Sequence, residues 1–191
     1  MRHPALDIIR DEHQALAAML RSLWLLLQQS RREGRLPDFG VLRAMLFYID
    51  EFPERLHHTK ESELLFPLLR ERAPELVPVL DRLDAEHAAG ERTIRALEHA
   101  LLAFEVMGEP RREAFEQMAD RYINGYLAHM SCEEHDVLPA AAKLLAPADW
   151  VDLDAAFAAN RDPLTGHPPD EPYRELFGKI VKMTPAPIGL G

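Results

Sequence analysis

The sequence has little cysteine, no long apolar run and a shortage of positive charge. Its single cysteine, Cys132, excludes an internal disulfide and favours a reducing, cytoplasmic setting. The absence of cysteine clusters argues against structural zinc and iron–sulfur sites. The longest strongly apolar run, residues 23–27, is far too short to cross a bilayer. The charged N-terminal stretch is unlike a secretory signal, so we expect a cytoplasmic protein without a membrane segment.

The charge balance also limits the classes of partner. The chain has 22 Lys and Arg against 32 Asp and Glu, a net charge of −10. A nucleic-acid-binding surface needs clustered positive charge, so we expect no nucleic-acid partner. The length of 191 residues suits one domain with a sizeable core and an appendage.

Four long segments carry apolar residues at alternating steps of three and four, the spacing of a helix packed on one side. They span about residues 5–32, 38–72, 74–108 and 111–145, with glycine or proline between them. Short connections place neighbouring long helices antiparallel, and no segment alternates like a strand. The sequence therefore predicts an all-α fold, with an antiparallel up-down-up-down four-helix bundle over residues 1–146.

Residues 147–191 differ in composition and are expected to form a short helical, proline-rich C-terminal extension. A short helix is predicted at 147–159, with Trp150, Leu153 and Phe157 on its inner side. Six of the fifteen prolines lie between Pro163 and Pro187. Within that stretch a second amphipathic helix is predicted from Tyr173, Leu176, Phe177, Ile180 and Val181. The extension is expected to pack on the bundle or on a partner subunit, which leaves a homodimer possible.

One histidine interrupts the apolar face of each predicted long helix: His13, His57, His87 and His129. A single histidine in such a place is usually a hydrogen-bonded core residue. Four that converge in one core need partners, and a shared metal satisfies all of them most simply.

An internal repeat strengthens the metal interpretation. His57-x-x-x-Glu61 and His129-x-x-x-Glu133 are each followed at equal offsets by an apolar pair and a proline. The preceding helices contain the matching pairs Glu12-His13 and Glu86-His87. Residues four apart lie one turn apart on the same helix face, so the histidine can bind one ion while the glutamate reaches between two. Imidazole together with carboxylate favours iron or manganese.

With these motifs, over about residues 5–145, the chain resembles the hemerythrin-like (HHE cation-binding) family. The resemblance is carried by Asp11-Glu12-His13, by His57-His58-Thr59-Lys60-Glu61 with the following Leu64-Leu65-Phe66-Pro67, by Glu86-His87, and by His129-x-x-x-Glu133-Glu134. It implies two iron ions with a bridging oxo or hydroxo group, and binding of dioxygen or another small diatomic or anion. The expected metal ligands are His13, His57, Glu61, His87, His129 and Glu133.

Two neighbouring carboxylates, Glu91 and Glu134, are further candidate ligands. Oxygen-carrying members of the family have a fifth histidine one turn after the third-helix histidine, where this chain has Glu91. Glu91 is expected either to reach an open iron position or to pair with Arg95. Glu134, five residues after His129, is an alternative to Glu133 as the bridge.

Two further positions beside these motifs carry expectations of their own. Gly90 costs helix stability, and we expect its missing side chain to leave room for a small ligand. His58 lies one position away from the apolar face, so it is expected beside the centre or at the surface rather than in the centre.

The leading hypothesis is a di-iron protein that binds dioxygen or nitric oxide for sensing, detoxification or limited redox chemistry. One alternative is an iron-handling, ferroxidase-like or iron-centre repair protein. Its ferritin-like Glu-x-x-His pattern matches Glu54-x-x-His57, but the third helix offers Asp84-x-x-His87 and the fourth offers none. A second alternative is an iron-responsive regulatory module. The sequence does not decide whether the protein turns over a substrate.

Overall fold

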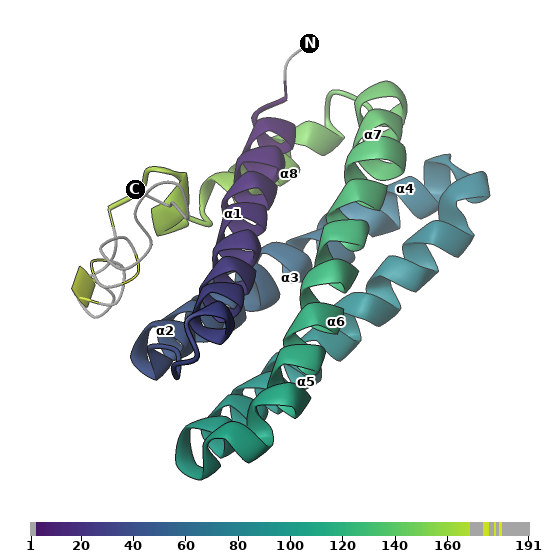
Figure 1. The fold of residues 1–191 in the computed structure, drawn as a ribbon. Helices are drawn as coiled ribbons and strands as arrows, with labels where there is room; N and C mark the ends of the chain where they lie inside the picture. The colour runs from purple at the N-terminus through teal and green to yellow at the C-terminus, as the bar shows by residue number, and fades with distance from the viewer. Residues whose placement is uncertain (1–2, 169–173, 176–177, 179, 181–191) are drawn as a thin grey trace.

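The computed structural model describes residues 3–168 together with 174, 175, 178 and 180. All regular structure in this part of the chain is helical (Figure 1), which confirms the predicted all-α class. No helix among the described residues is both long enough and apolar enough to span a membrane. Most of the second amphipathic helix predicted for the extension lies outside the described residues, although Ile180 is buried in the core.

The four long helical segments are present, and several change helix type along their length. The first is α1 (Pro4–Arg32), and the second is a continuous run of α2 (Phe39–Ile49), η1 (Asp50–His57), α3 (His58–Lys60), η2 (Glu61–Leu65) and α4 (Phe66–Arg72). The third is η3 (Pro74–Leu76) with α5 (Val77–Met107), and the fourth is η4 (Glu109–Arg111) with α6 (Arg112–Cys132), η5 (Glu133–Val137) and α7 (Leu138–Leu144). The chain then forms α8 (Asp149–Ala158) and the single turn η6 (Pro163–Thr165).

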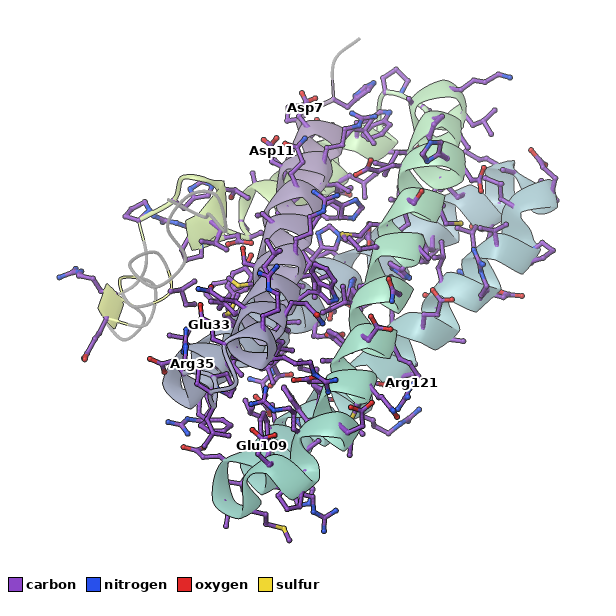
Figure 2. The ribbon with its side chains drawn as sticks, in the orientation of Figure 1. Asp7, Asp11, Glu33, Arg35, Glu109 and Arg121 are labelled. Atoms are coloured by element: carbon purple, nitrogen blue, oxygen red, sulfur yellow. The ribbon has the colours of Figure 1, made fainter. Side chains whose placement is uncertain are left out.

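Local sequence explains where these segments begin and end. Asp38 caps α2, because its side chain accepts a hydrogen bond from the backbone N–H of Val41 at 3.0 Å. Gly34 follows α1 and Gly108 follows α5, with φ of 62° and 72°, a region that glycine enters without steric cost. Charged side chains such as Glu33 and Arg121 lie on the outside (Figure 2).

Three stretches near the histidines are π-helical, with wider turns than an α-helix. The first of them, η1, contains Pro53 and ends at His57. The stretches η2 and η5 begin at Glu61 and Glu133 and end two residues before Pro67 and Pro139. A proline ring clashes with the carbonyl group four residues earlier. In η2 and η5 that carbonyl lies inside the π-helical turn, and the wider turn relieves the clash.

The histidines lie between two separate apolar clusters. One cluster contains Leu16, Ile94 and Ile123, and the other contains Ile9, Leu83 and Val137. In α1, α5 and the α6–η5 segment, the histidine falls between a residue of each cluster. The polar centre is therefore enclosed above and below by packed apolar side chains.

Contacts between helices bring these residues together. α1 packs on α6 and α8, α5 packs on α2 and α6, and α4 packs on α7. Trp150, Leu153 and Phe157 of α8 are buried, as predicted, and join the apolar cluster around Ile9. The backbone N–H of Ala5 donates to Asp154 at 2.8 Å and fixes α8 against the start of α1.

Candidate metal centre

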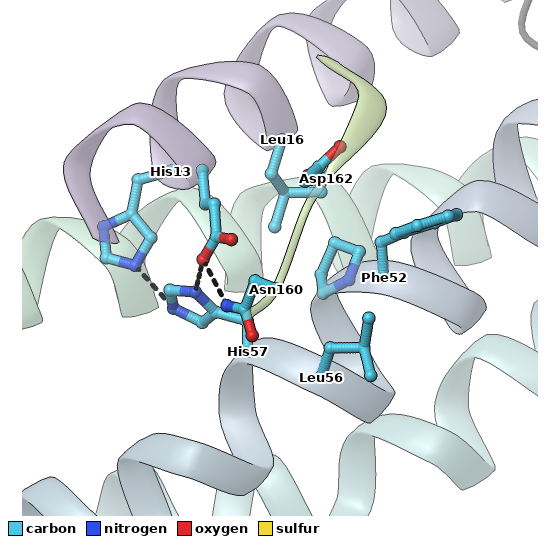
Figure 3. A pocket seen from close by; sticks show the side chains of 9 residues that line it. His13, Leu16, Phe52, Leu56, His57, Asn160 and Asp162 are labelled. Atoms are coloured by element: carbon cyan, nitrogen blue, oxygen red, sulfur yellow. Dashed lines mark hydrogen bonds and ion pairs between the residues drawn. The ribbon is translucent and has the colours of Figure 1, made fainter. Parts of the chain in front are cut away.

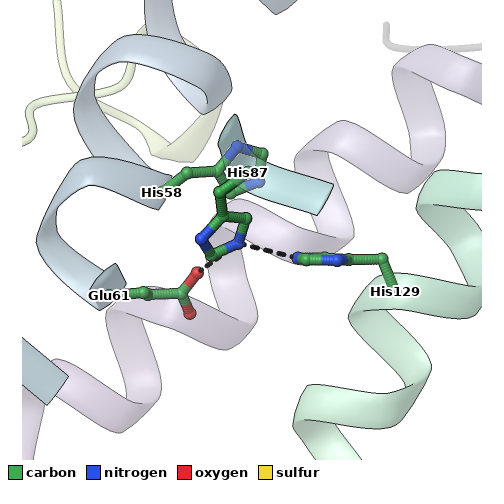
Figure 4. Close-up of side chains that lie close together, drawn as sticks. All are labelled: His58, Glu61, His87 and His129. Carbon is green, nitrogen blue, oxygen red and sulfur yellow. Dashed lines mark hydrogen bonds and ion pairs between the residues drawn. The ribbon is translucent and has the colours of Figure 1, made fainter. Parts of the chain in front are cut away.

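The four predicted histidines converge as two facing pairs. The Nε2 atoms of His13 and His57 are 3.2 Å apart (Figure 3), and those of His87 and His129 are 2.9 Å apart (Figure 4). All four side chains are at most 6% exposed. A neutral imidazole protonated at Nδ1 presents a lone pair at Nε2, so two facing Nε2 atoms repel unless a proton or a cation lies between them.

A glutamate holds one histidine of each pair from behind. His57 donates from Nδ1 to Glu12 at 2.7 Å, and His129 donates from Nδ1 to Glu86 at 2.7 Å. These glutamates precede His13 and His87 in sequence, so each orients the histidine of a neighbouring helix. Metal-binding histidines commonly donate their second ring nitrogen to a carboxylate, which fixes the tautomer that leaves Nε2 free.

The other two histidines have Nδ1 contacts as well. Nδ1 of His87 lies 2.8 Å from the Ser62 hydroxyl, and His13 donates from Nδ1 to Glu134 at 3.2 Å. The Glu134 side chain is 40% exposed and lies behind His13, on the side away from Nε2. The structure therefore places it as a partner of His13 and not between the two histidine pairs.

Glu61 and Glu133 lie in the middle of the cluster with fully buried side chains. An oxygen of Glu61 is 3.2 Å from Nε2 of His57 and 3.6 Å from Nε2 of His87. Glu133 likewise reaches across the cluster, with its oxygens 3.3 Å from Nε2 of His13 and 3.2 Å from Nε2 of His129. Each carboxylate thus contacts a histidine of both pairs.

The four oxygens of Glu61 and Glu133 are buried and have no hydrogen-bond partner among the described residues. Their contacts with the imidazoles are close charge contacts without hydrogen-bond geometry. A buried carboxylate without a partner costs several kcal/mol, and a cation bound between the carboxylates removes that cost. The residues present therefore fit a metal centre, with oxygen and imidazole donors aimed at one buried space.

Charge within the cluster is strongly coupled. Burial opposes ionisation of Glu133, yet its contacts with His129, His13 and His87 outweigh burial and hold its pKa well below the usual range. Burial also disfavours the charged form of His129, but Glu133 and Glu86 raise its pKa to about 9. Because the pKa of His129 is raised, a metal ion that binds its imidazole has to displace a proton.

The structure brings together all six residues named as ligands from the sequence, but it leaves Glu91 out. The Glu91 side chain is more than half exposed and pairs with Arg95, one turn along α5. The space that a side chain at Gly90 would occupy is not empty, because a Cβ there would lie 2.1 Å from a carboxylate oxygen of Glu54. Glu54 fills that space.

His58 does not lie at the surface, and it comes closer to the cluster than its place one position off the apolar face indicates. It is buried, its ring stacks on His87 with centroids 4.3 Å apart, and one of its nitrogens belongs to a potential metal-binding group with Glu61, His87 and His129. The π-helix that ends at His57 explains the difference, because wider turns change which side chains face inward. Pro53 was the available signal for such a change.

The two sides of the cluster differ in their access to solvent. A cavity of about 240 Å³ lies between α5 and α6, is lined by Gly90, Gly125 and Tyr126, and reaches His87 and His129. Beside His13 and His57 the chain leaves only about 10 Å³, and Asn160 lines that space. That volume barely holds one water molecule.

A helical bundle with a buried centre of histidines and carboxylates defines a cation-binding protein. Residues 5–141 match the family described as the hemerythrin HHE cation binding domain, and the chain belongs to this family. An uncharacterized protein of Haemophilus influenzae is 32% identical over 114 residues, which cover 54% of this chain. The match covers 65% of that relative, slightly less than two thirds of its length.

Proposed function

We propose that this chain is a non-haem di-iron protein of the cytoplasm that binds dioxygen or a related diatomic such as nitric oxide. The observation that carries the proposal is the pair of buried carboxylates, Glu61 and Glu133, whose four oxygens have no hydrogen-bond partner in the part of the chain that the structure describes. They lie between two pairs of facing imidazole nitrogens, which suggests one cation for each pair. The family membership supports a cation at this place.

In this proposal His13 and His57 hold one iron, His87 and His129 hold the other, and the two carboxylates bridge them. Imidazole and carboxylate donors without cysteine suit iron better than soft metal ions. When bound, two irons with a bridging oxo or hydroxo group supply open coordination positions and one-electron redox chemistry. We further propose that residues 1–146 form the antiparallel four-helix bundle that delivers these ligands, and that residues 147–191 form an extension to it.

The protein contributes orientation and selective access. Glu12 and Glu86 hold His57 and His129 in the tautomer that presents Nε2 to a cation. The cavity between α5 and α6 reaches His87 and His129, and its volume admits a diatomic molecule or a small anion such as azide. We therefore propose that the exogenous ligand binds from this side.

A ferritin-like ligand pattern is not favoured by the side-chain contacts. Glu54 precedes His57 at the required spacing, but its carboxylate accepts hydrogen bonds from Tyr122 and Tyr126 and faces His58. Asp84, at the same spacing before His87, pairs with Arg70 at 2.7 Å. Neither carboxylate is directed at the facing histidine pairs, so we retain the diatomic-binding proposal.

Anaerobic titration of the metal-free protein with Fe(II), followed by elemental analysis, tests the proposal. We expect about two irons per chain, and a change in the visible spectrum when dioxygen or nitric oxide is added. His129→Ala should lose most of the metal, whereas His99→Ala, an exposed change on α5, should keep it. One bound zinc with no measurable iron affinity would refute the proposal.

A further inference from the structure

His58 occupies a place from which a side chain reaches the metal cluster. Its ring is 4% exposed, lies parallel to the His87 ring within 16°, and has a nitrogen close to donor atoms of Glu61, His87 and His129, all within 4.8 Å of one another. The donor atoms grouped with His13 and His57 include no such additional histidine. The two halves of the repeat therefore differ by one imidazole.

The orientation of His58 follows the same pattern as that of the other histidines. Its Nδ1 faces a carboxylate oxygen of Glu54 at 3.3 Å, one turn earlier on the same helical segment. Because Nδ1 is engaged there, Nε2 is the nitrogen left to bind a cation. Glu54 is itself held, since its other oxygen accepts hydrogen bonds from Tyr122 at 3.0 Å and from Tyr126.

Gly90 provides an independent observation at the same place. A glycine inside a helix costs about 1 kcal/mol relative to alanine, so its presence in the middle of α5 needs a reason. A Cβ at residue 90 would approach Oε2 of Glu54 to 2.1 Å, and this is the oxygen that faces His58. Gly90 therefore makes room for the carboxylate that orients His58.

We propose that His58 is a fifth nitrogen ligand, at the position shared by His87 and His129, and that Glu54 and Gly90 are its positioning residues. The inference rests on the proposed di-metal centre. It makes the two metal positions unequal, with three imidazoles on the side of the α5–α6 cavity and two on the side of His13. The nitrogen comes from the second helical segment, whereas the position one turn after His87 carries Glu91, which points to solvent.

His58→Phe tests ligation separately from packing, because phenylalanine keeps a flat ring that can stack on His87 but has no nitrogen. The metal-free proteins are titrated with Co(II) and followed by visible absorption and calorimetry. We expect the wild type to bind two ions, and His58→Phe to bind one of them at least tenfold more weakly, as expected for a weakened coordination shell. His99→Ala is the control with unchanged binding.

A count of ligated imidazoles gives a direct readout on the cobalt-loaded proteins. Each histidine bound through Nε2 retains an Nδ1 proton, which gives one exchangeable, paramagnetically shifted proton signal. All five Nδ1 atoms have an oxygen partner that protects such a proton. We expect five shifted signals from the wild type and four from His58→Phe. If His58→Phe gives as many shifted signals as the wild type and binds both Co(II) ions with wild-type affinity, His58 is not a ligand. If the wild type binds no metal, the di-metal centre is refuted as well.

The positioning role of Gly90 and Glu54 is tested by replacing, one at a time, two glycines that line the same cavity. Gly90→Ala forces Glu54 away from His58, whereas a Cβ at Gly125 meets nothing within 4 Å. We expect Gly90→Ala to weaken the same Co(II) position as His58→Phe and to broaden or remove the same proton signal. Gly125→Ala should retain both Co(II) affinities and all five signals. If the two alanine variants behave alike, Gly90 does not position the ligand through Glu54.

Discussion

Replacing Asn160 should destabilise the fold at both the C-terminal segment after α8 and the proposed metal centre, because this residue connects them. It follows α8, is 5% exposed, and donates from Nδ2 to Glu12 at 2.9 Å. Its amide oxygen accepts a hydrogen bond from Lys60. The Glu12 oxygen that accepts from Asn160 also accepts from His57 at 2.7 Å. Asn160→Ala therefore removes a buried partner of the carboxylate that orients a proposed metal ligand.

The magnitude follows from the charge and burial of Glu12. A hydrogen bond to a charged group contributes about 1.5–3 kcal/mol, and leaving the buried carboxylate short of a donor accounts for most of that loss. For a chain of this size 1 kcal/mol corresponds to a shift of roughly 2–4 °C in Tm. Asn160→Ala should therefore lower Tm by roughly 3–12 °C. Asn160→Asp should cost more, because it places a second carboxylate against Glu12 and offsets this only through Lys60.

The assay is thermal unfolding of the metal-free and metal-loaded proteins, monitored by circular dichroism. Asn124→Ala is the control, because Asn124 is exposed on α6 and alanine is the better helix former there. It should melt at or slightly above the wild-type temperature. If Asn160→Ala melts within a degree of the wild type, or Asn160→Asp is the more stable variant, the extension is not coupled to Glu12 in the way described.

Three other predictions concern the centre itself. Removing the metal should lower Tm, because the buried oxygens of Glu61 and Glu133 then lose their cation; equal Tm values for the chelated and loaded proteins would contradict a central site. Glu133→Gln should lose iron on elemental analysis, whereas Glu134→Gln, a change behind His13 at a partly exposed side chain, should retain it. Gly125→Phe should slow azide binding to the oxidised centre in stopped-flow absorption, because the ring narrows the α5–α6 cavity; an unchanged rate would mean that ligands enter elsewhere.

The parts of the structure that sequence predicted are those governed by helical periodicity. Apolar spacing predicted four long helical segments, and the interruptions in that spacing predicted His13, His57, His87 and His129. The repeated His-x-x-x-Glu spacing likewise predicted Glu61 and Glu133, because residues four apart share a face of any nearly regular helix. All six side chains meet in one cluster, and each is at most 6% exposed.

The sequence did not predict the positions or contacts of His58, Gly90 and Asn160, because these arise from departures from that periodicity or from contacts between distant residues. His58 faces the cluster because η1 is π-helical, and a period of 3.6 cannot anticipate this. Position 90 needs a glycine because the carboxylate of Glu54, from a different helical segment, occupies the space of a side chain there. Asn160 lies beyond α8 in an irregular stretch with no periodic signal, so its contact with Glu12 is visible only in the folded chain.

The repeat makes the two halves of the centre alike in sequence, but the fold makes them unlike in their surroundings. Glu12 and Glu86 hold their histidines at the same 2.7 Å distance. The Glu12 side chain is 7% exposed and is covered by Asn160, whereas that of Glu86 is 44% exposed and lines the cavity between α5 and α6. The residues around a metal site control the access of solvent and ligands to it. We therefore expect the position at His87 and His129 to exchange ligands, and the position at His13 and His57 to stay closed.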